Sequence, residues 1–123
     1  MKSIVVIEDS PTQAQQIAAH LSGFGLQVFV AHDGPEGLQL VDEVQPNAVV
    51  LDVNLPSMNG FQICRRLKRD ENLADIPVIM LTSADGSDDI LQGLDMGATD
   101  YIPKDAYAAD NLVTTLQALG LMT

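Results

Sequence analysis

Four short, strand-like runs of the sequence each lead into a side chain that could take part in chemistry. The carboxylates are Glu8 and Asp9 after the first run and Asp52 after the second. A hydroxyl, Thr82, follows the third run, and an ammonium, Lys104, follows the last. Hard divalent cations prefer carboxylate ligands, and lysine and hydroxyl groups can contact the oxygens of a phosphoryl group. These residue types favour a site for a cation and a phosphoryl group.

The charges of this set would balance around one magnesium ion. Three carboxylates, one Mg²⁺ and Lys104 contribute −3, +2 and +1, which sum to zero. Without a cation the carboxylates would raise one another's pKa by repulsion. A carboxylate beside Mg²⁺ and a lysine could accept a phosphoryl group, and aspartyl phosphates are established covalent intermediates. Each residue alone also fits a helix cap, a strand-end hydroxyl or a solvated lysine, so the inference depends on their joint placement.

This chemistry requires that the runs be strands of one sheet. The strongest runs, 4–7, 48–51 and 78–81, are continuous and rich in β-branched residues, as in strands buried on both faces of a parallel sheet. A weaker strand is expected at 26–30 and a short one at 100–102. Because the carboxyl ends of parallel strands share one edge, Asp9 and Asp52 should lie close together.

Segments with the apolar spacing of helices alternate with these strands. The apolar stripes lie at 14–21, 38–44, 63–67, 90–94 and 112–119. Ser10 and Pro11 suit the N-cap and first position of the first helix, and Gly97 and Gly120 follow the fourth and fifth helices as C′ glycines would. The alternation predicts an α/β fold, a single doubly wound five-stranded parallel sheet in the flavodoxin-like order 2-1-3-4-5, with five helices.

The length, net charge and cysteine content of the chain limit the domain organisation, partners and location that we expect. The length of 123 residues suits one domain, which we expect to span 1–123 with no output module. A formal net charge of −11 argues against nucleic acid and anionic membranes as partners. No apolar run approaches the ~20 residues of a membrane span. The single cysteine, Cys64, excludes a disulfide within the chain, and a cytoplasmic location is the simpler expectation.

In the order and spacing of its motifs the sequence resembles the response regulator receiver domain, the CheY-like family of two-component signalling. The resemblance covers essentially the whole chain. It rests on Glu8-Asp9, on Leu51-Asp52-Val53-Asn54-Leu55-Pro56 with Met58-Asn59-Gly60, on Leu81-Thr82-Ser83-Ala84, and on 97–102 leading to Lys104. It implies a phosphorylation-activated switch that receives its phosphoryl group from a phosphohistidine of a histidine kinase or of a phosphotransfer protein.

The resemblance also implies where the acceptor and the metal ligands lie. Asp52 is the expected phosphoacceptor and one ligand of Mg²⁺. Asp9 is expected to bind Mg²⁺ directly, Glu8 through a water, and Asn54 through its backbone carbonyl. Glu8 stands where an aspartate is commoner, and its side chain is one methylene longer.

Four further residues match family positions around the phosphoryl group. Thr82, Lys104 and the backbone N–H of Ser83 are expected to contact it. Tyr101 matches a switch position whose ring turns inward when Thr82 moves, although it also fits an ordinary edge-strand aromatic. Family members often carry a cis bond between this lysine and a proline, whereas Asp105 follows Lys104 here. We expect either a trans bond with a shifted loop or a strained cis bond.

The expected output face comprises the fourth helix, the fifth strand and the fifth helix. From 85 to 123 the sequence has seven Asp and one Lys, a net charge of 1 − 7 = −6, which favours a protein target over DNA. Four of the six basic residues fall within 65–69, which fits a solvated helix end or a docking patch for an acidic partner. The two histidines, His20 and His32, are expected to lie far from the acidic pocket.

Several functions stay open on the sequence. The first is a signalling switch that is not an enzyme on external substrates; it is expected to be a stand-alone regulator, with a receiver domain cut from a hybrid kinase or a larger regulator as the alternative. A Mg²⁺-dependent phosphohydrolase acting through an aspartyl phosphate is the second, but Asn54 stands where such hydrolases carry an acid/base carboxylate. The third is an interaction domain that works without phosphate.

Overall fold

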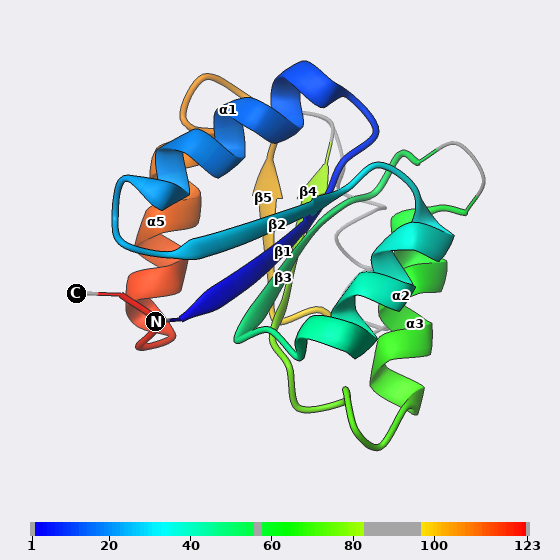
Figure 1. The fold of residues 1–123 in the computed structure, drawn as a ribbon. Coiled ribbons are helices and arrows are strands. Elements are labelled where there is room, and N and C mark those ends of the chain that lie inside the picture. The colour runs from blue at the N-terminus through cyan, green and yellow to red at the C-terminus, as the bar shows by residue number, and fades with distance from the viewer. Residues whose placement is uncertain (1, 56–57, 83–96, 123) are drawn as a thin grey trace.

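The chain alternates between strands and helices in a computed structural model that describes residues 2–55, 58–82 and 97–122 (Figure 1). The strands are β1 (Ser3–Ile7), β2 (Gln27–Ala31), β3 (Ala48–Asp52), β4 (Val78–Thr82) and β5 (Asp100–Pro103). The helices of the described part are α1 (Pro11–Ser22), α2 (Gly34–Val44), α3 (Gly60–Arg69) and α5 (Ala108–Ala118). The helix expected at 90–94 lies outside the described residues.

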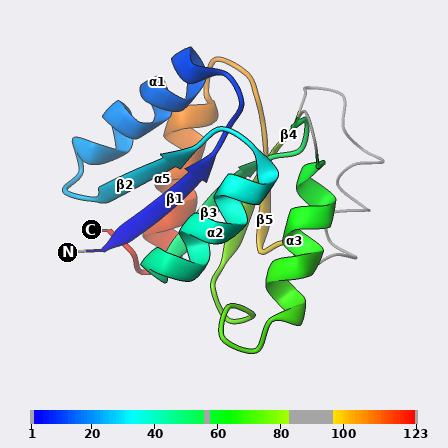
Figure 2. The ribbon, with the colours of Figure 1, turned by 45° about the vertical axis from the view of Figure 1, so that its right-hand side comes forward.

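The five strands form one parallel sheet in the order β2-β1-β3-β4-β5, which confirms the predicted topology. Helices α1 and α5 cover one face, and α2 and α3 cover the other (Figures 1 and 2). Alternate residues of β1, such as Val5 and Val6, join separate apolar clusters on the two faces. Burial on both faces explains why the central strands are continuous apolar runs.

The central strands extend one residue further than their apolar runs, and this fixes two site residues. Asp52 ends β3 and pairs in register with Leu81. Thr82 ends β4 and pairs with Pro103. The backbone at these positions is therefore held by the parallel ladder and is not part of a loop, so the directions of both side chains are set by the sheet.

The first helix begins as the sequence predicts. Pro11 is its first residue, and the Ser10 hydroxyl accepts a hydrogen bond from the Gln13 backbone N–H at 3.3 Å. Helix α3 begins with a complete capping box, in which Asn59 Oδ1 accepts from the Gln62 N–H at 3.0 Å and Gln62 Oε1 accepts from the Asn59 N–H at 3.1 Å. Both helices thus satisfy part of their unpaired first-turn donors through a side chain.

The basic end of α3 is only partly a solvated face. Arg65, Arg66 and Arg69 are exposed. Lys68 instead donates hydrogen bonds from Nζ to the carbonyl oxygens of Ala74 at 3.0 Å and Ile76 at 2.8 Å. This lysine therefore fastens the connection between α3 and β4 and is not part of the exposed patch.

Gly60 lies where α3 begins against the end of β3. A Cβ at this position would lie 2.5 Å from the Asp52 carbonyl oxygen and 2.8 Å from the Val53 Cα. Both are backbone atoms, so the clash would have to be relieved by moving α3 or the end of β3. Gly60→Ala is expected to lower the free energy of unfolding by about 1–3 kcal/mol, as overpacking of a core typically does. Urea unfolding measures the change.

The matched control for this substitution is Gly23→Ala at the end of α1. Its φ of −62° suits any residue, and the nearest atom to an added Cβ is 3.3 Å away. We expect a change of less than about 0.5 kcal/mol there, because that atom is a carbonyl oxygen of the last turn of α1 and the added Cβ would touch it without overlapping it. Equal stability of Gly60→Ala and the parent chain would contradict the close approach of α3 to β3.

The two ends of the fold lie side by side. Strand β1 begins, and α5 ends, at the edge of the sheet opposite to the one that carries Asp52 (Figures 1 and 2). Leu121 and Met122 pack against the apolar cluster that contains Ile4. No helix in 2–55, 58–82 or 97–122 has the length and hydropathy needed to cross a membrane.

Candidate functional site

Three carboxylates gather at the carboxyl edge of β1 and β3. Ile7 pairs with Leu51 in the parallel ladder, which places the residues after β1 beside the end of β3. Glu8, Asp9 and Asp52 each offer a carboxylate oxygen, and the three oxygens all lie within 4.8 Å of one another. The structure thus brings together the carboxylates that the sequence placed at one edge of the sheet.

Two of the three carboxylates are buried and share one lysine. The exposed fraction is 1% for both Glu8 and Asp52, whereas Asp9 is exposed. Lys104 Nζ donates to Asp52 Oδ2 at 2.7 Å and lies 2.8 Å from Glu8 Oε2. The contact with Asp52 is an aligned hydrogen bond, whereas Glu8 Oε2 has the ion pair but no aligned hydrogen bond within the described part of the chain. Lys104 therefore offsets only part of the negative charge at this edge.

Burial changes the acid strength of two of these groups. Removal from water raises the pKa of Glu8 to about 7, with a smaller contribution from the negative charge of Asp52, although the contacts from Lys104 and the Ser10 N–H oppose the shift. Burial alone would lower the pKa of Lys104, but its contacts with Asp52 and Glu8 outweigh that effect and the pKa is raised. Lys104 is therefore an ammonium throughout the physiological range, while Glu8 titrates within it.

The raised pKa of Glu8 predicts how stability changes with pH when no metal is present. The folded chain holds the proton of Glu8 more tightly than the unfolded chain, whose carboxyl has its ordinary pKa near 4.5. This stabilisation is present at pH 5 and is lost as the pH rises through 7. It amounts to about 2 kcal/mol between pH 5 and pH 8. Glu8→Gln, which cannot ionise, is expected to lose this part of the pH dependence.

Urea unfolding at pH 5, 6, 7 and 8 in the presence of a chelator measures this effect. Glu71→Gln, an exposed position after α3, is the control and should follow the parent profile. If Glu8→Gln and the parent chain differ by the same free energy at pH 5 and at pH 8, Glu8 does not titrate as described.

The donor atoms of this cluster fit a hard divalent cation. Glu8 Oε2 is buried and has an ion pair with Lys104 but no aligned hydrogen bond in the described part of the chain, and Asp9 brings a further carboxylate oxygen to the same cluster. One Asp52 oxygen accepts from the Asn54 backbone N–H at 3.0 Å and the other from Lys104. Carboxylates with waters completing the shell are the usual environment of Mg²⁺ in proteins. The cluster could therefore hold a metal ion with Glu8, Asp9 and Asp52 as ligands.

The remaining residues expected at the site lie around this cluster. Thr82 is 2% exposed at the end of β4, and its carbonyl oxygen accepts from the Lys104 N–H at 2.6 Å. Tyr101 is half-buried in β5 and packs against the apolar cluster on the α3 side of the sheet. Ser83 lies outside the described residues. Thr82 and Lys104 are thus held next to each other by the sheet, at the same edge as Asp52.

The bond between Lys104 and Asp105 is trans, which is the first of the two alternatives expected from the sequence. Asp105 does not approach the carboxylate cluster as a further ligand in the described part of the chain. Its Oδ1 accepts from the Tyr107 backbone N–H at 2.8 Å and so belongs to the turn before α5. Lys104 still reaches both Asp52 and Glu8 from this trans backbone.

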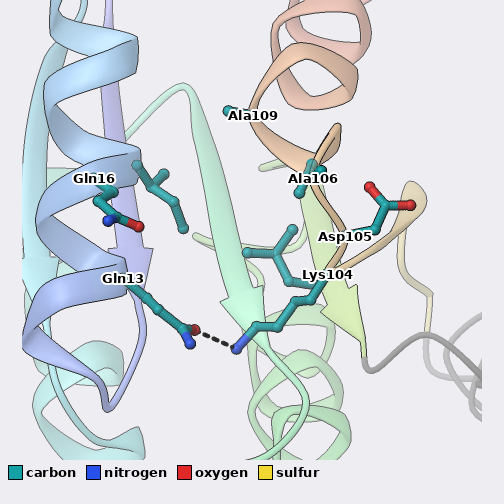
Figure 3. Close-up of a pocket in the computed structure, with 9 residues that line it drawn as sticks. Gln13, Gln16, Lys104, Asp105, Ala106 and Ala109 are labelled. Carbon is teal, nitrogen blue, oxygen red and sulfur yellow. Dashed lines mark hydrogen bonds between the residues drawn. The ribbon is translucent and has the colours of Figure 1, made fainter.

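A cavity of about 390 Å³ lies between α1 and the segment that joins β5 to α5 (Figure 3). Its residues are Gln13, Gln16, Ile17, Leu81, Lys104, Asp105, Ala106, Ala108 and Ala109. The Lys104 side chain extends along it toward α1, and its Nζ donates to Gln13 Oε1 at 3.1 Å. Lys104, whose ammonium lies beside Asp52, thus also lines a cavity that has both polar and apolar residues on its walls.

Two residues near the site were not predicted from the sequence. Gln13 contacts Lys104, although no sequence argument assigned it a role. His32 was expected to lie far from the pocket, and this is wrong: its Nδ1 lies 3.2 Å from the Glu8 carbonyl oxygen, because the end of β2 is paired with the end of β1. For Gln13 the available signal was Ser10, because a serine N-cap at this position places Gln13 in the first turn of α1, close to the end of β1.

Sequence comparison identifies relatives over almost the whole chain. The profile of the response regulator receiver domain matches residues 4–117. The DNA-binding dual master transcriptional regulator RpaA of Synechocystis sp. is 39% identical over 119 residues, which are 97% of this chain and 49% of that protein. The chain therefore spans about half the length of the curated relatives it matches.

Structure comparison gives the same result for the fold. The chemotaxis protein CheY4 of Vibrio cholerae superposes with a TM-score of 0.89 at 27% identity, covering 96% of this chain and 98% of that chain. The receiver domain of a signal transduction histidine kinase from Syntrophus aciditrophicus superposes with a TM-score of 0.88 at 33% identity, covering 97% and 89%.

Proposed function

Because this chain belongs to the response regulator receiver domain family of two-component systems, we propose that it is a switch activated by phosphorylation of Asp52. The phosphoryl donor is a phosphohistidine of a histidine kinase or of a histidine phosphotransfer protein. The reaction depends on Mg²⁺ bound by Glu8, Asp9, Asp52 and the backbone carbonyl of Asn54. Phosphorylation then changes the face through which the domain binds its target.

The environment of Asp52 is the observation that carries this proposal. Its carboxylate is almost completely buried, yet it lies beside two other carboxylates and is paired with Lys104. A structural aspartate would gain little from such crowding, because each neighbouring negative charge adds an electrostatic cost. A phosphoacceptor benefits from it, because a cation and Lys104 together can neutralise the charge of an incoming phosphoryl group.

The proposed transfer conserves atoms and charge. A carboxylate oxygen of Asp52 forms a bond to phosphorus while the bond between phosphorus and the imidazole nitrogen of the donor breaks. The bonding electrons return to that nitrogen, and the histidine is released. Lys104 and the hydroxyl of Thr82, together with the Ser83 backbone N–H, bind the phosphoryl oxygens. Mg²⁺, when bound, supplies positive charge to those oxygens and holds them in place.

The change caused by phosphorylation of Asp52 reaches the target-binding face through Thr82 and β5 in this proposal. Thr82 pairs with Pro103, two residues after Tyr101, so a movement of Thr82 toward a phosphoryl group is transmitted to the strand that carries Tyr101. We place the binding face for the target on the fourth helix, β5 and α5. The acidic charge of this part of the sequence favours a protein target with basic or apolar contacts.

The partners proposed for this chain are proteins. RpaA is named as a DNA-binding regulator, and that description belongs to the longer protein. The present chain carries a net charge of −11, which would oppose contact with the phosphate backbone of nucleic acid. We propose no turnover of external substrates and a cytoplasmic place of action, where histidine kinases present their phosphohistidines. We also propose that residues 1–123 form one receiver domain.

The test is the uptake of a phosphoryl group from acetyl phosphate in the presence of Mg²⁺. Mass spectrometry of the intact chain suits this measurement, because the sequence has no tryptophan to report the change by fluorescence. One phosphoryl group per chain, attached to an aspartate and labile in base, supports the proposal. Sustained release of phosphate from several phosphomonoesters would instead identify a phosphohydrolase.

A further inference from the structure

The start of α1 carries the sequence pattern of a capping box but does not form one. In such a box the third residue after the N-cap sends its side chain back to the N-cap N–H, as Gln62 does in α3. Gln13 occupies the same place in α1, three residues after Ser10. The Ser10 N–H is already taken, because it donates to Glu8 Oε1 at 3.2 Å. The side chain of Gln13 is thereby released from its usual capping contact.

The side chain of Gln13 instead points toward Lys104 at the site. Gln13 Oε1 accepts a hydrogen bond from Lys104 Nζ at 3.1 Å across the cavity between α1 and the segment after β5 (Figure 3). The backbone of Gln13 is fixed at the same time by its hydrogen bond to the Ser10 hydroxyl. The backbone of the acceptor is therefore fixed at the start of α1, and its exposed side chain reaches from there to the ammonium.

Lys104 Nζ has three polar contacts in the described part of the chain, which are aligned hydrogen bonds to Asp52 and Gln13 and an ion pair with Glu8. Two of them, Glu8 and Asp52, are also candidate ligands of the metal. A cation would compete with Lys104 for their oxygens. Among these three contacts, Gln13 is the one that lies outside the carboxylate cluster, so its hydrogen bond does not depend on whether the cluster holds a cation.

We propose that Gln13 is a positioning residue for phosphoryl transfer. It holds the Lys104 ammonium next to Asp52 when the buried carboxylates bind Mg²⁺ in competition with the lysine. The proposal deepens the proposed function and depends on it. Gln13 itself does not touch the phosphoryl group. Gln13 orients the Lys104 side chain, and this raises the fraction of time that the ammonium lies in place when the donor is bound.

Gln13→Met tests this proposal, because methionine keeps the length of the side chain and removes the acceptor. With Mg²⁺ present and phosphoramidate as the donor, we expect the rate of labelling at saturating donor to fall about three- to tenfold, as for loss of one partly exposed hydrogen bond to a charged group. The donor concentration that gives half the maximal rate should change by less than about twofold, because the effect is on the chemical step.

Two matched variants separate positioning from a general effect on α1. Gln13→Glu keeps an acceptor at the same length but adds a negative charge near the donor site, so we expect the donor concentration for half the maximal rate to rise while the maximal rate stays above that of Gln13→Met. Gln16→Met changes a glutamine that lines the same cavity without a hydrogen bond to Lys104 among the described contacts, and it should leave the rate unchanged. In the Mg²⁺-free protein, the side-chain NMR signal of the Lys104 ammonium should shift in Gln13→Met but not in Gln16→Met.

The outcomes distinguish this inference from the proposed function. An unlabelled parent chain would reject the phosphoacceptor function itself. A parent chain that is labelled on Asp52 while Gln13→Met is labelled equally fast would overturn only the role of Gln13. The same conclusion follows if Gln16→Met loses as much activity as Gln13→Met, or if the maximal rate of Gln13→Glu is no higher than that of Gln13→Met.

Discussion

Asp52→Ala is expected to abolish uptake of a phosphoryl group from acetyl phosphate and Mg²⁺. The variant lacks a buried carboxylate that accepts an aligned hydrogen bond from Lys104 and lies at the end of a central strand. The neighbouring Glu8 is one methylene longer and follows a different strand, so its carboxylate does not take the position of Asp52 at the end of β3. Intact-mass spectrometry after incubation with the donor measures the loss.

The control for this experiment is Asp42→Ala, which removes an exposed aspartate on α2. It should be labelled like the parent chain. Circular dichroism and urea unfolding establish that Asp52→Ala is folded, so that a lack of labelling reports on the acceptor. Labelling of Asp52→Ala at the parent rate would place the phosphoryl group on another residue and remove the basis of the proposed function.

Removal of the divalent cation is expected to reduce phosphoryl uptake about as much as Asp52→Ala does. A chelator should reduce labelling to background, because the remaining positive charge, on Lys104, faces three carboxylates and the charge of the donor. Asp9→Ala should weaken Mg²⁺ binding by at least about tenfold, since even the loss of an outer-shell partner commonly costs that much. Asp9 is suited to this test because it is exposed, so its removal leaves the buried contacts of Glu8 and Asp52 intact.

Mg²⁺ titration followed by NMR measures the affinity directly and does not depend on labelling. Asp110→Ala, an exposed acidic residue on α5, is the matched control and should bind Mg²⁺ like the parent chain. Full labelling in the presence of a chelator, or unchanged Mg²⁺ affinity in Asp9→Ala, would show that the carboxylate cluster has another role.

The sheet was predictable from the sequence because its central strands are buried on both faces. Continuous apolar runs such as 48–51 are typical of such strands, and their alternation with helical stripes leaves one common topology. The convergence of Asp9 and Asp52 followed from that topology alone. The exact strand ends did not, because the pairing of Asp52 with Leu81 is a property of the ladder and carries no pattern in the sequence.

Contacts that depend on competition between side chains were not predictable in the same way. The sequence places Gln13 three residues after a serine, which by itself indicates a capping contact. Only the structure shows that Glu8 takes the N–H to which Gln13 would have bonded. His32 was misplaced for a related reason, since the register of β1 and β2 decides what the end of β2 contacts.

The adjacent ends of β1 and α5 have a practical consequence for biosensor engineering. A short flexible linker could join the two ends, and a circular permutant could then be opened in the exposed turn at 23–25. A fluorophore or a fused protein attached beside the start of β1 or the end of α5 would lie at the edge of the sheet opposite to the carboxylates. Either format would keep the attached group away from the carboxylate cluster while it reports on the conformation of the domain.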